Sequence, residues 1–111
     1  SNLMGRVRHG GGYRTGLLIV NGSGSLRYQK TARVKIVALN LAGEQGEGNF
    51  DIAALTGRIV WVDEVIPDLQ HLLGSSSVGG LLVKSADADL NCQLLTTTTG
   101  GAVSLQHLWG Y

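Results

Sequence analysis

The sequence predicts an all-β fold, a single β-sandwich or jelly-roll-like domain of about eight short antiparallel strands with at most one short helix. Short segments in which apolar residues alternate with period two recur at intervals of roughly 8 to 14 residues, and glycines mark the turns between them. The chain has 111 residues, including 17 glycines and a single proline. This length suits one domain with one modest core.

The first half of the domain is expected to contain three strands. Residues 14–21 have apolar side chains on both faces, and Asn21-Gly22 then opens a tight turn of the type that needs positive φ. Residues 25–29 are expected to be the return strand. Residues 32–41 are the longest candidate, and one of their faces changes from basic to apolar along its length. Such a change predicts that the strand passes from water into a subunit contact.

The second half alternates in the same way. Residues 50–56 and 58–65 are predicted strands, the second being rich in β-branched and aromatic side chains. Residues 67–73 are the only helix candidate, since Pro67 suits a first helical position, although an extended segment is nearly as compatible. A short strand over residues 81–84 precedes the final hairpin.

The final hairpin, residues 88–111, consists of two alternating segments joined by a threonine run and Gly100-Gly101. Leu94 lies on one predicted face and Leu95 on the other, with Leu108 assigned to the second face. Because both faces are apolar, we expect the hairpin to be a seam between the core and a neighbouring subunit. Leu108→Asp is then expected to weaken assembly more than folding.

Residues 1–13 are rich in glycine and basic residues, and they are expected to form a flexible lead-in to a sandwich over residues 14–111. No phosphate-binding loop pattern is present in this stretch. No apolar run reaches the ~18–20 residues that cross a bilayer, so membrane insertion is not expected.

Charged residues make up 15% of the chain, whereas about 25% is usual for soluble proteins. A small domain with so little charge and several strands apolar on both faces predicts a homo-oligomer. The charge is also unevenly distributed, because seven basic residues precede the first acid, Glu44. We interpret this as pairing within the fold or between subunits. Nucleic acid is not expected as a partner, because net charge is only +1 and few aromatic residues accompany the basic half.

No motif in the sequence indicates catalysis, a metal site or a cofactor, so the chain is not expected to be an enzyme. His9, His71 and His107 lie outside any metal-ligand spacing, although histidines from several subunits could still meet on a symmetry axis. Asp63 and Glu64 are adjacent on a predicted strand and therefore point to opposite faces. Cys92 is the only cysteine and is expected to be a buried apolar residue.

The ending TTTTGGAVSLQHLWGY, the preceding GGLLVKSADADLNCQLL and the opening GYRTGLLIVNGS resemble strands of phage tail-fibre and related virion β-sandwich domains. The resemblance is one of pattern over much of the chain. It implies a non-enzymatic structural or receptor-binding domain of a tail fibre or related attachment structure, acting as a homo-oligomer, with a trimer favoured. The implied location is the virion tail, or otherwise the cell surface or the extracellular space, and the implied partner is a glycan or protein of the host surface.

The alternative function is a monomeric carbohydrate-binding accessory module of a bacterial surface protein or enzyme. That function requires an exposed aromatic platform, for which the sources are Tyr13, Tyr28, Phe50, Trp61, Trp109 and Tyr111. The candidate ligand-binding residues are the terminal aromatics Trp109 and Tyr111 and the basic residues Arg6, Arg8 and Arg14. A role in packing and interfaces competes with this assignment.

Overall fold

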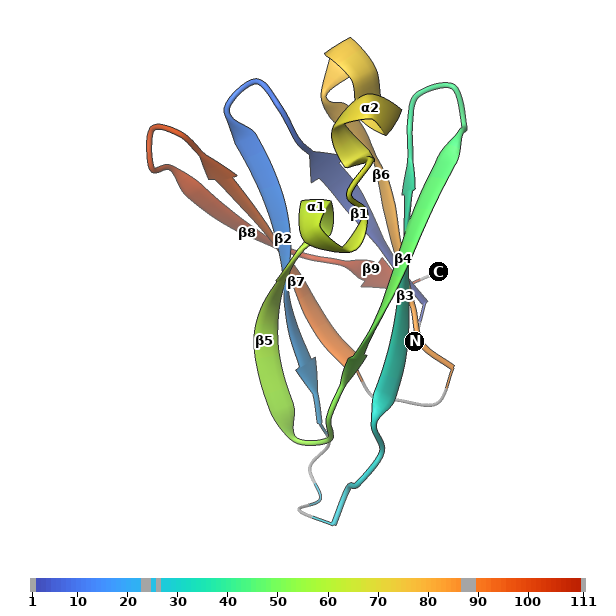
Figure 1. Ribbon diagram of the computed structural model, residues 1–111. Coiled ribbons are helices and arrows are strands. Elements are labelled where there is room, and N and C mark those ends of the chain that lie inside the picture. Colours follow the sequence, from blue (N-terminus) through green and yellow to red (C-terminus); the bar gives the residue numbers. More distant parts are fainter. Residues whose placement is uncertain (1, 23–24, 26, 87–89, 111) are drawn as a thin grey trace.

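The computed structural model describes residues 2–22, 25, 27–86 and 90–110, and of Trp109 only the backbone. Two antiparallel sheets pack face to face as a β-sandwich (Figure 1). One sheet has the strand order β4-β3-β6-β1-β9 and the other the order β5-β2-β7-β8. The predicted all-β sandwich is confirmed.

The strands follow the chain in an order that places sequence-distant segments side by side. Their bounds are β1 Asn2–Arg8, β2 Tyr13–Asn21, β3 Ala32–Leu39, β4 Gln45–Ile52, β5 Thr56–Trp61, β6 Val78–Lys84, β7 Leu90–Thr98, β8 Val103–His107 and β9 Trp109–Gly110. Strand β1 pairs along its whole length with β6, and β2 lies between β5 and β7.

The core lies between the sheets and is built by the period-two alternation of the strands. In β2, every second residue from Thr15 to Asn21 is fully buried, including Leu17 and Ile19. The opposite sheet contributes Ile36 from β3 and Leu81 from β6, both fully buried. Each strand thus turns one set of alternate side chains into the core.

Short helices follow β5 in the chain. They are α1 (Val62–Val65), α2 (Leu69–Leu73) and a 3₁₀ turn at Gly74–Ser76. Helix α1 lies between β5 and β4, and α2 lies toward one end of the sandwich (Figure 1). Strand β5 ends at Trp61, so the predicted strand over 58–65 is wrong beyond that residue. The buried residues that follow recur every three or four positions, which is helical spacing: Val62, Ile66, Leu69 and Leu73.

The prediction of a flexible lead-in over residues 1–13 is wrong for β1. Val7 is fully buried, and Leu3 packs against the core on the same face. Between them Gly5 has no side chain to show the alternation, which is why the sequence did not reveal this strand. The glycine-rich character instead belongs to the β1–β2 turn, where Gly10, Gly11 and Gly12 all have positive φ.

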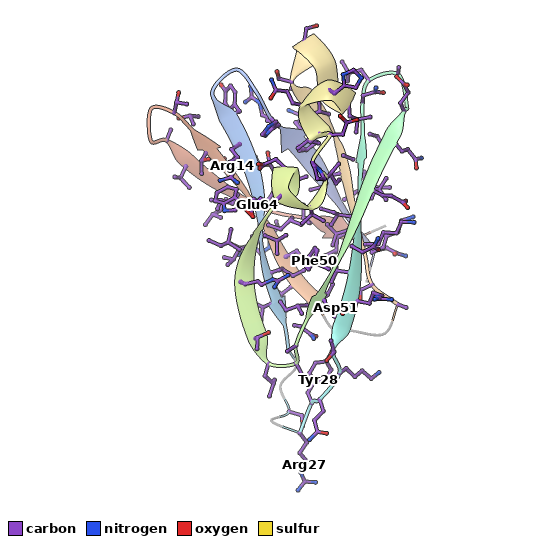
Figure 2. The ribbon with its side chains drawn as sticks, viewed as in Figure 1. Arg14, Arg27, Tyr28, Phe50, Asp51 and Glu64 are labelled. Carbon is purple, nitrogen blue, oxygen red and sulfur yellow. The ribbon has the colours of Figure 1, made fainter. Side chains whose placement is uncertain are left out.

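Two further segments differ from the prediction. The described residues of 25–29 form no strand, and the hydroxyl of Tyr28 instead donates to the buried side chain of Asn21 over 2.8 Å. Figure 2 shows Tyr28 at the end of the sandwich opposite the helices. The predicted strand over 50–56 is divided between β4 and β5 by a turn in which Leu55 has a φ of 59°.

Candidate functional site

A cleft of about 460 Å³ opens between β1 of one sheet and β7 and β8 of the other. Its polar lining comes from two regions that are far apart in sequence. Strand β1 contributes Arg6 and Arg8, and the β7–β8 hairpin contributes Thr96, Ser104 and Gln106. A volume of this size is within the ~300–1,000 Å³ range of small-molecule sites.

The polar residues of the hairpin occupy inward-facing positions. Ser104 pairs with Thr96, and Gln106 pairs with Leu94, whose side chain is buried in the core. Ser104 and Gln106 are nevertheless exposed. Inward positions that pack against the opposite sheet usually carry apolar residues. The exposed polar side chains of Ser104 and Gln106 therefore mark the place where the packed interior gives way to a solvent-accessible cleft.

The apolar floor of the cleft separates it from the core. Leu94 and Leu108 form this floor, and both are buried. Leu108 reaches its place because Gly5 of β1 carries no side chain there. This geometry corrects the expectation that Leu108 faces a neighbouring subunit: the residue belongs to the core of its own chain, since the chain leaves β8 before position 108 and turns back toward β1.

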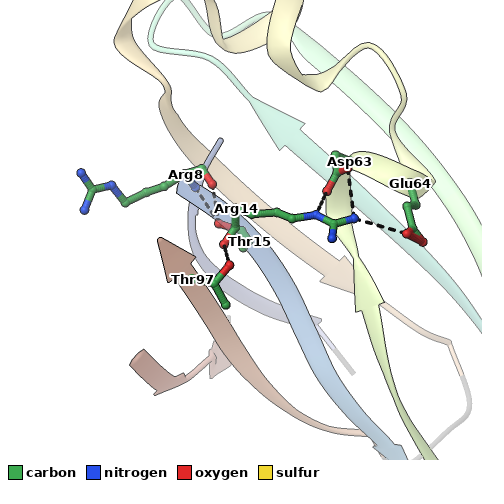
Figure 3. A network of polar contacts seen from close by, with 6 residues as sticks. All are labelled: Arg8, Arg14, Thr15, Asp63, Glu64 and Thr97. Atoms are coloured by element: carbon green, nitrogen blue, oxygen red, sulfur yellow. Dashed lines mark hydrogen bonds and ion pairs between the residues drawn. The ribbon is translucent and has the colours of Figure 1, made fainter. Parts of the chain in front are cut away.

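The backbone of β1 beside the cleft is held by one hydroxyl. The Thr15 side chain accepts a hydrogen bond from the Arg8 N–H (2.9 Å) and donates one to the Arg8 carbonyl (2.7 Å) (Figure 3). The guanidinium carbon of Arg8 lies 3.7 Å from the centroid of the Tyr13 ring. The arginine is therefore positioned by contacts with its own chain, including a cation–π contact.

The arginines of the cleft differ from Arg33 and Lys35 in their partners. Arg33 and Lys35 each pair with a carboxylate, at 3.4 and 3.0 Å. In the described part of the chain, neither Arg6 nor Arg8 forms an ion pair with a carboxylate. The residues that line the cleft also include no Asp or Glu.

Arg14 lies elsewhere, on the outer side of the four-stranded sheet (Figures 2 and 3). Its Nε donates to an Asp63 carboxylate oxygen over 2.9 Å, and its Nη2 lies 3.3 Å from Glu64. The guanidinium carbon is 4.1 Å from the centroid of the Trp61 ring. The hydrogen bond with Asp63 raises the pKa of Arg14 above its ordinary value, so its charge is locally compensated.

The structure thus brings together two of the five predicted site residues, Arg6 and Arg8. Arg14 is engaged with Asp63 and Glu64, and both acids converge on it because Glu64 lies in α1 and not on a strand. The Trp109 side chain and Tyr111 lie outside the described part of the chain. Sequence reasoning missed Thr96, Ser104 and Gln106. The available signal was the run of alternate polar residues facing inward on the final hairpin.

The aromatic rings that the structure describes are each engaged with another residue. Arg8 stacks on Tyr13, Arg14 on Trp61 and Arg58 on Phe50. Tyr28 bonds to Asn21. Three of the four described aromatic rings thus have an arginine over one ring face, which leaves less open ring surface for the alternative carbohydrate-binding function.

The exposed face of the four-stranded sheet, which we call the outer face, carries apolar side chains on all four strands, and Gln93 and His107 lie in the same row as Leu18. The register aligns Trp61, Gly16, Leu95 and Leu105 in one row and places Ile59 beside Leu18 in the next. Ile59 is 50% exposed, Leu105 55% and Val103 63%. Among the described residues of its four strands, Arg14 is the only Lys, Arg, Asp or Glu on this face.

The remaining chemical candidates offer no site in the described residues. They include no group of three or more His, Cys, Asp or Glu that could hold a metal ion. Cys92 is buried in the core, and burial raises the pKa of its thiol to about 11. No described helix is long and apolar enough to span a membrane.

Comparisons with known proteins support the fold. No protein-family model matches the chain, and no curated protein matches it. The crystal structure of Thermotoga maritima 1070 is similar, with a TM-score of 0.72 over 99% of this chain and 93% of that chain. The two sequences are 12% identical, so the similarity concerns the fold alone.

Proposed function

We propose that this chain is a non-enzymatic β-sandwich domain that acts as a homo-oligomer, in a structural or receptor-binding role in a phage tail fibre or related virion attachment structure. The virion role rests on the resemblance of the terminal segments. The homo-oligomer rests on one observation, the apolar outer face of the four-stranded sheet.

The size of the outer face can be compared with that of a subunit interface. Its four strands are five to nine residues long, and at a spacing of about 4.8 Å they cover roughly 450 Å² in projection. The accessible surface of protruding side chains is larger than this projection, which brings the outer face toward the ~800 Å² per partner of a specific interface. An apolar patch of this extent on a small domain favours burial.

A second copy of the chain is the occupant that fits the outer face. The apolar side chains of Leu18, Leu95 and Leu105 lie in its middle, beside the uncharged side chain of Gln93. The single cation, Arg14, is compensated by Asp63 and Glu64. Two copies packed face to face would therefore meet without an uncompensated arginine on either side.

The test measures the mass in solution at micromolar concentration by light scattering after size exclusion. The wild-type chain is expected at a multiple of its 11.7 kDa chain mass. Leu105→Asp on β8 and Ile59→Asp on β5 place a charge at opposite sides of the outer face, and each is expected to give a folded monomer. Circular dichroism checks that the fold is retained.

Leu41→Asp is the matched control. Leu41 is 78% exposed and follows β3 at Leu39, away from the outer face. This variant is expected to keep the wild-type mass. A wild-type chain that is monomeric at micromolar concentration would refute the proposal, and so would folded Leu105→Asp and Ile59→Asp variants of unchanged mass.

A further inference from the structure

We infer that the cleft between β1 and β8 is a binding site for a small acidic sugar, in which arginine binds a carboxylate and the β7–β8 hairpin binds hydroxyl groups. This inference goes beyond the proposed function, because assembly through the outer face requires no ligand. It also rests on different residues, those of β1 and of the inward side of β8.

The cleft carries a local positive charge. Arg6 and Arg8 lie on the same side of β1, two residues apart, and both line the cleft. Neither forms an ion pair within the described part of the chain, whereas Arg14, Arg33 and Lys35 all do. Two guanidinium groups in a cleft lined by no carboxylate leave a local positive charge, for which the complement is an anion.

The edge of β1 that faces the cleft is only partly paired with another strand. Strand β9 covers this edge only at Leu3 and Met4, and Thr15 bonds both backbone groups of Arg8. Alternate residues of a strand direct their backbone groups to the same edge. Arg6 lies two residues from both Met4 and Arg8, so its N–H and C=O also point to this edge. The cleft therefore offers backbone groups that are directed by a rigid strand.

The opposite wall of the cleft carries hydroxyl and amide groups. Thr96 and Ser104 form a cross-strand pair of hydroxyl groups, and Gln106 adds an amide two residues further along β8. Each of these groups can donate and accept hydrogen bonds, as sugar hydroxyls can. An apolar floor of Leu94 and Leu108 lies beneath them. A hydroxyl-rich acid with one apolar ring face matches all three surfaces.

Arginine is suited to the carboxylate because its planar guanidinium can form two parallel hydrogen bonds with the two oxygens. The contact of Arg8 with Tyr13 limits the freedom of this side chain before any ligand arrives. A partly pre-positioned donor reduces the ordering cost of binding. The ligand class is therefore a sugar acid such as a hexuronate, and not a neutral sugar.

The experiment titrates the full chain with D-glucuronate at constant ionic strength and follows amide shifts by NMR. We expect saturable binding with a Kd on the order of 1 mM and shifts confined to β1, β7 and β8. D-Glucose, which has no carboxylate, is expected to bind at least ten-fold more weakly. Acetate, which has no sugar ring, tests the hydroxyl wall and is expected to bind more weakly than glucuronate as well.

Arg6→Gln combined with Arg8→Gln is expected to weaken glucuronate binding at least ten-fold. Ser104→Ala combined with Gln106→Ala tests the opposite wall and is expected to weaken it several-fold. Arg14→Gln is the matched control, because it removes an arginine on the outer face of the four-stranded sheet, away from the cleft, and its affinity is expected to remain within two-fold of wild type. Thermal melts of each variant confirm the fold.

Three results would overturn the inference. They are the lack of saturable glucuronate binding, equal affinity for glucose and glucuronate, and an unchanged affinity in the folded Arg6→Gln, Arg8→Gln variant. None of them depends on the oligomeric mass. A failure of assembly with intact glucuronate binding would instead refute the proposed function alone.

Discussion

Leu108 occupies the space that Gly5 leaves open on β1, since a Cβ atom at position 5 would overlap the Cδ2 atom of Leu108. Through this contact the last part of the chain packs on the first. It also sets the floor of the cleft, because Leu108 separates the polar residues of β8 from the core. Several consequences can be measured on single variants.

Gly5→Ala is expected to lower the free energy of unfolding by about 1–3 kcal/mol, because the added methyl group forces Leu108 out of a packed position. Chemical denaturation measures the change. Gly80→Ala on the neighbouring strand β6 is the control. A Cβ there would meet Leu39 at an ordinary 3.6 Å, and its effect is expected to be small or stabilising. A Gly5→Ala chain as stable as wild type would show that the contact is loosely packed.

Asn21→Ala is expected to destabilise the fold by about 2–4 kcal/mol. The fully buried Asn21 side chain donates to the carbonyls of Lys30 (2.7 Å) and Ile52 (3.0 Å), and it accepts a bond from Tyr28. Removing it leaves all three partners with a lost hydrogen bond. Denaturant unfolding is again the measurement.

Two variants put the Asn21 result in context. Tyr28→Phe removes only one of the three bonds and is expected to cost about 1 kcal/mol. Asn49→Ala, at an exposed position on β4, is expected to change stability by less than about 0.5 kcal/mol. If Asn21→Ala and Asn49→Ala lower the free energy of unfolding equally, the hydrogen bonds of Asn21 do not stabilise the fold.

Cys92 is expected to react slowly with a thiol reagent at pH 8 in the folded chain and rapidly in denaturant. Burial raises the pKa of the thiol from 9.0 to about 11. Between about pH 9 and 11 the thiol therefore stays protonated in the folded chain, whereas in the unfolded chain it has lost its proton. Stability is full below about pH 9 and falls as the pH rises toward about 11, by an amount on the order of 2 kcal/mol.

The Cys92→Ala variant isolates the contribution of this thiol to the pH dependence. Lysines and tyrosines also titrate in this range, so the informative quantity is the difference between the two stability curves. That difference is expected to shrink between pH 9 and 11, because only the wild-type chain loses the thiol contribution. Parallel curves, or fast reaction of the folded chain, would contradict a buried thiol.

The sandwich could be predicted because the alternation of apolar residues is visible wherever successive inward positions of a strand carry apolar side chains. Leu17 and Ile19 show it, and both are core residues. The pattern fails at Gly5, where the inward position is empty, and at Val62, where inward positions change to helical spacing. Asn21 was expected only to open a turn, because its three bonding partners lie up to 31 residues away.

The cleft could be predicted only in part. The sequence indicated Arg6 and Arg8 as binding candidates from their charge. It did not reveal that Ser104 would lie across from them, because that neighbourhood arises when the two sheets pack together. Arg14 looked equivalent to the other two arginines in sequence. Its separate role follows from the short helix α1, which brings Glu64 to the same side as Asp63.

The pairing of β1 with β9 also has a mechanical consequence. Leu3 lies opposite Gly110, so the chain enters and leaves the fold at the same end of one antiparallel pair. The hydrogen bonds of such a pair run perpendicular to the strands. A pulling force applied at residues 2 and 110 would therefore break these bonds one after another and not all together. Strand β9 contributes two residues to this pairing. A domain of this design bears tension poorly along its own chain, and a load-bearing assembly would have to transmit force through contacts between subunits.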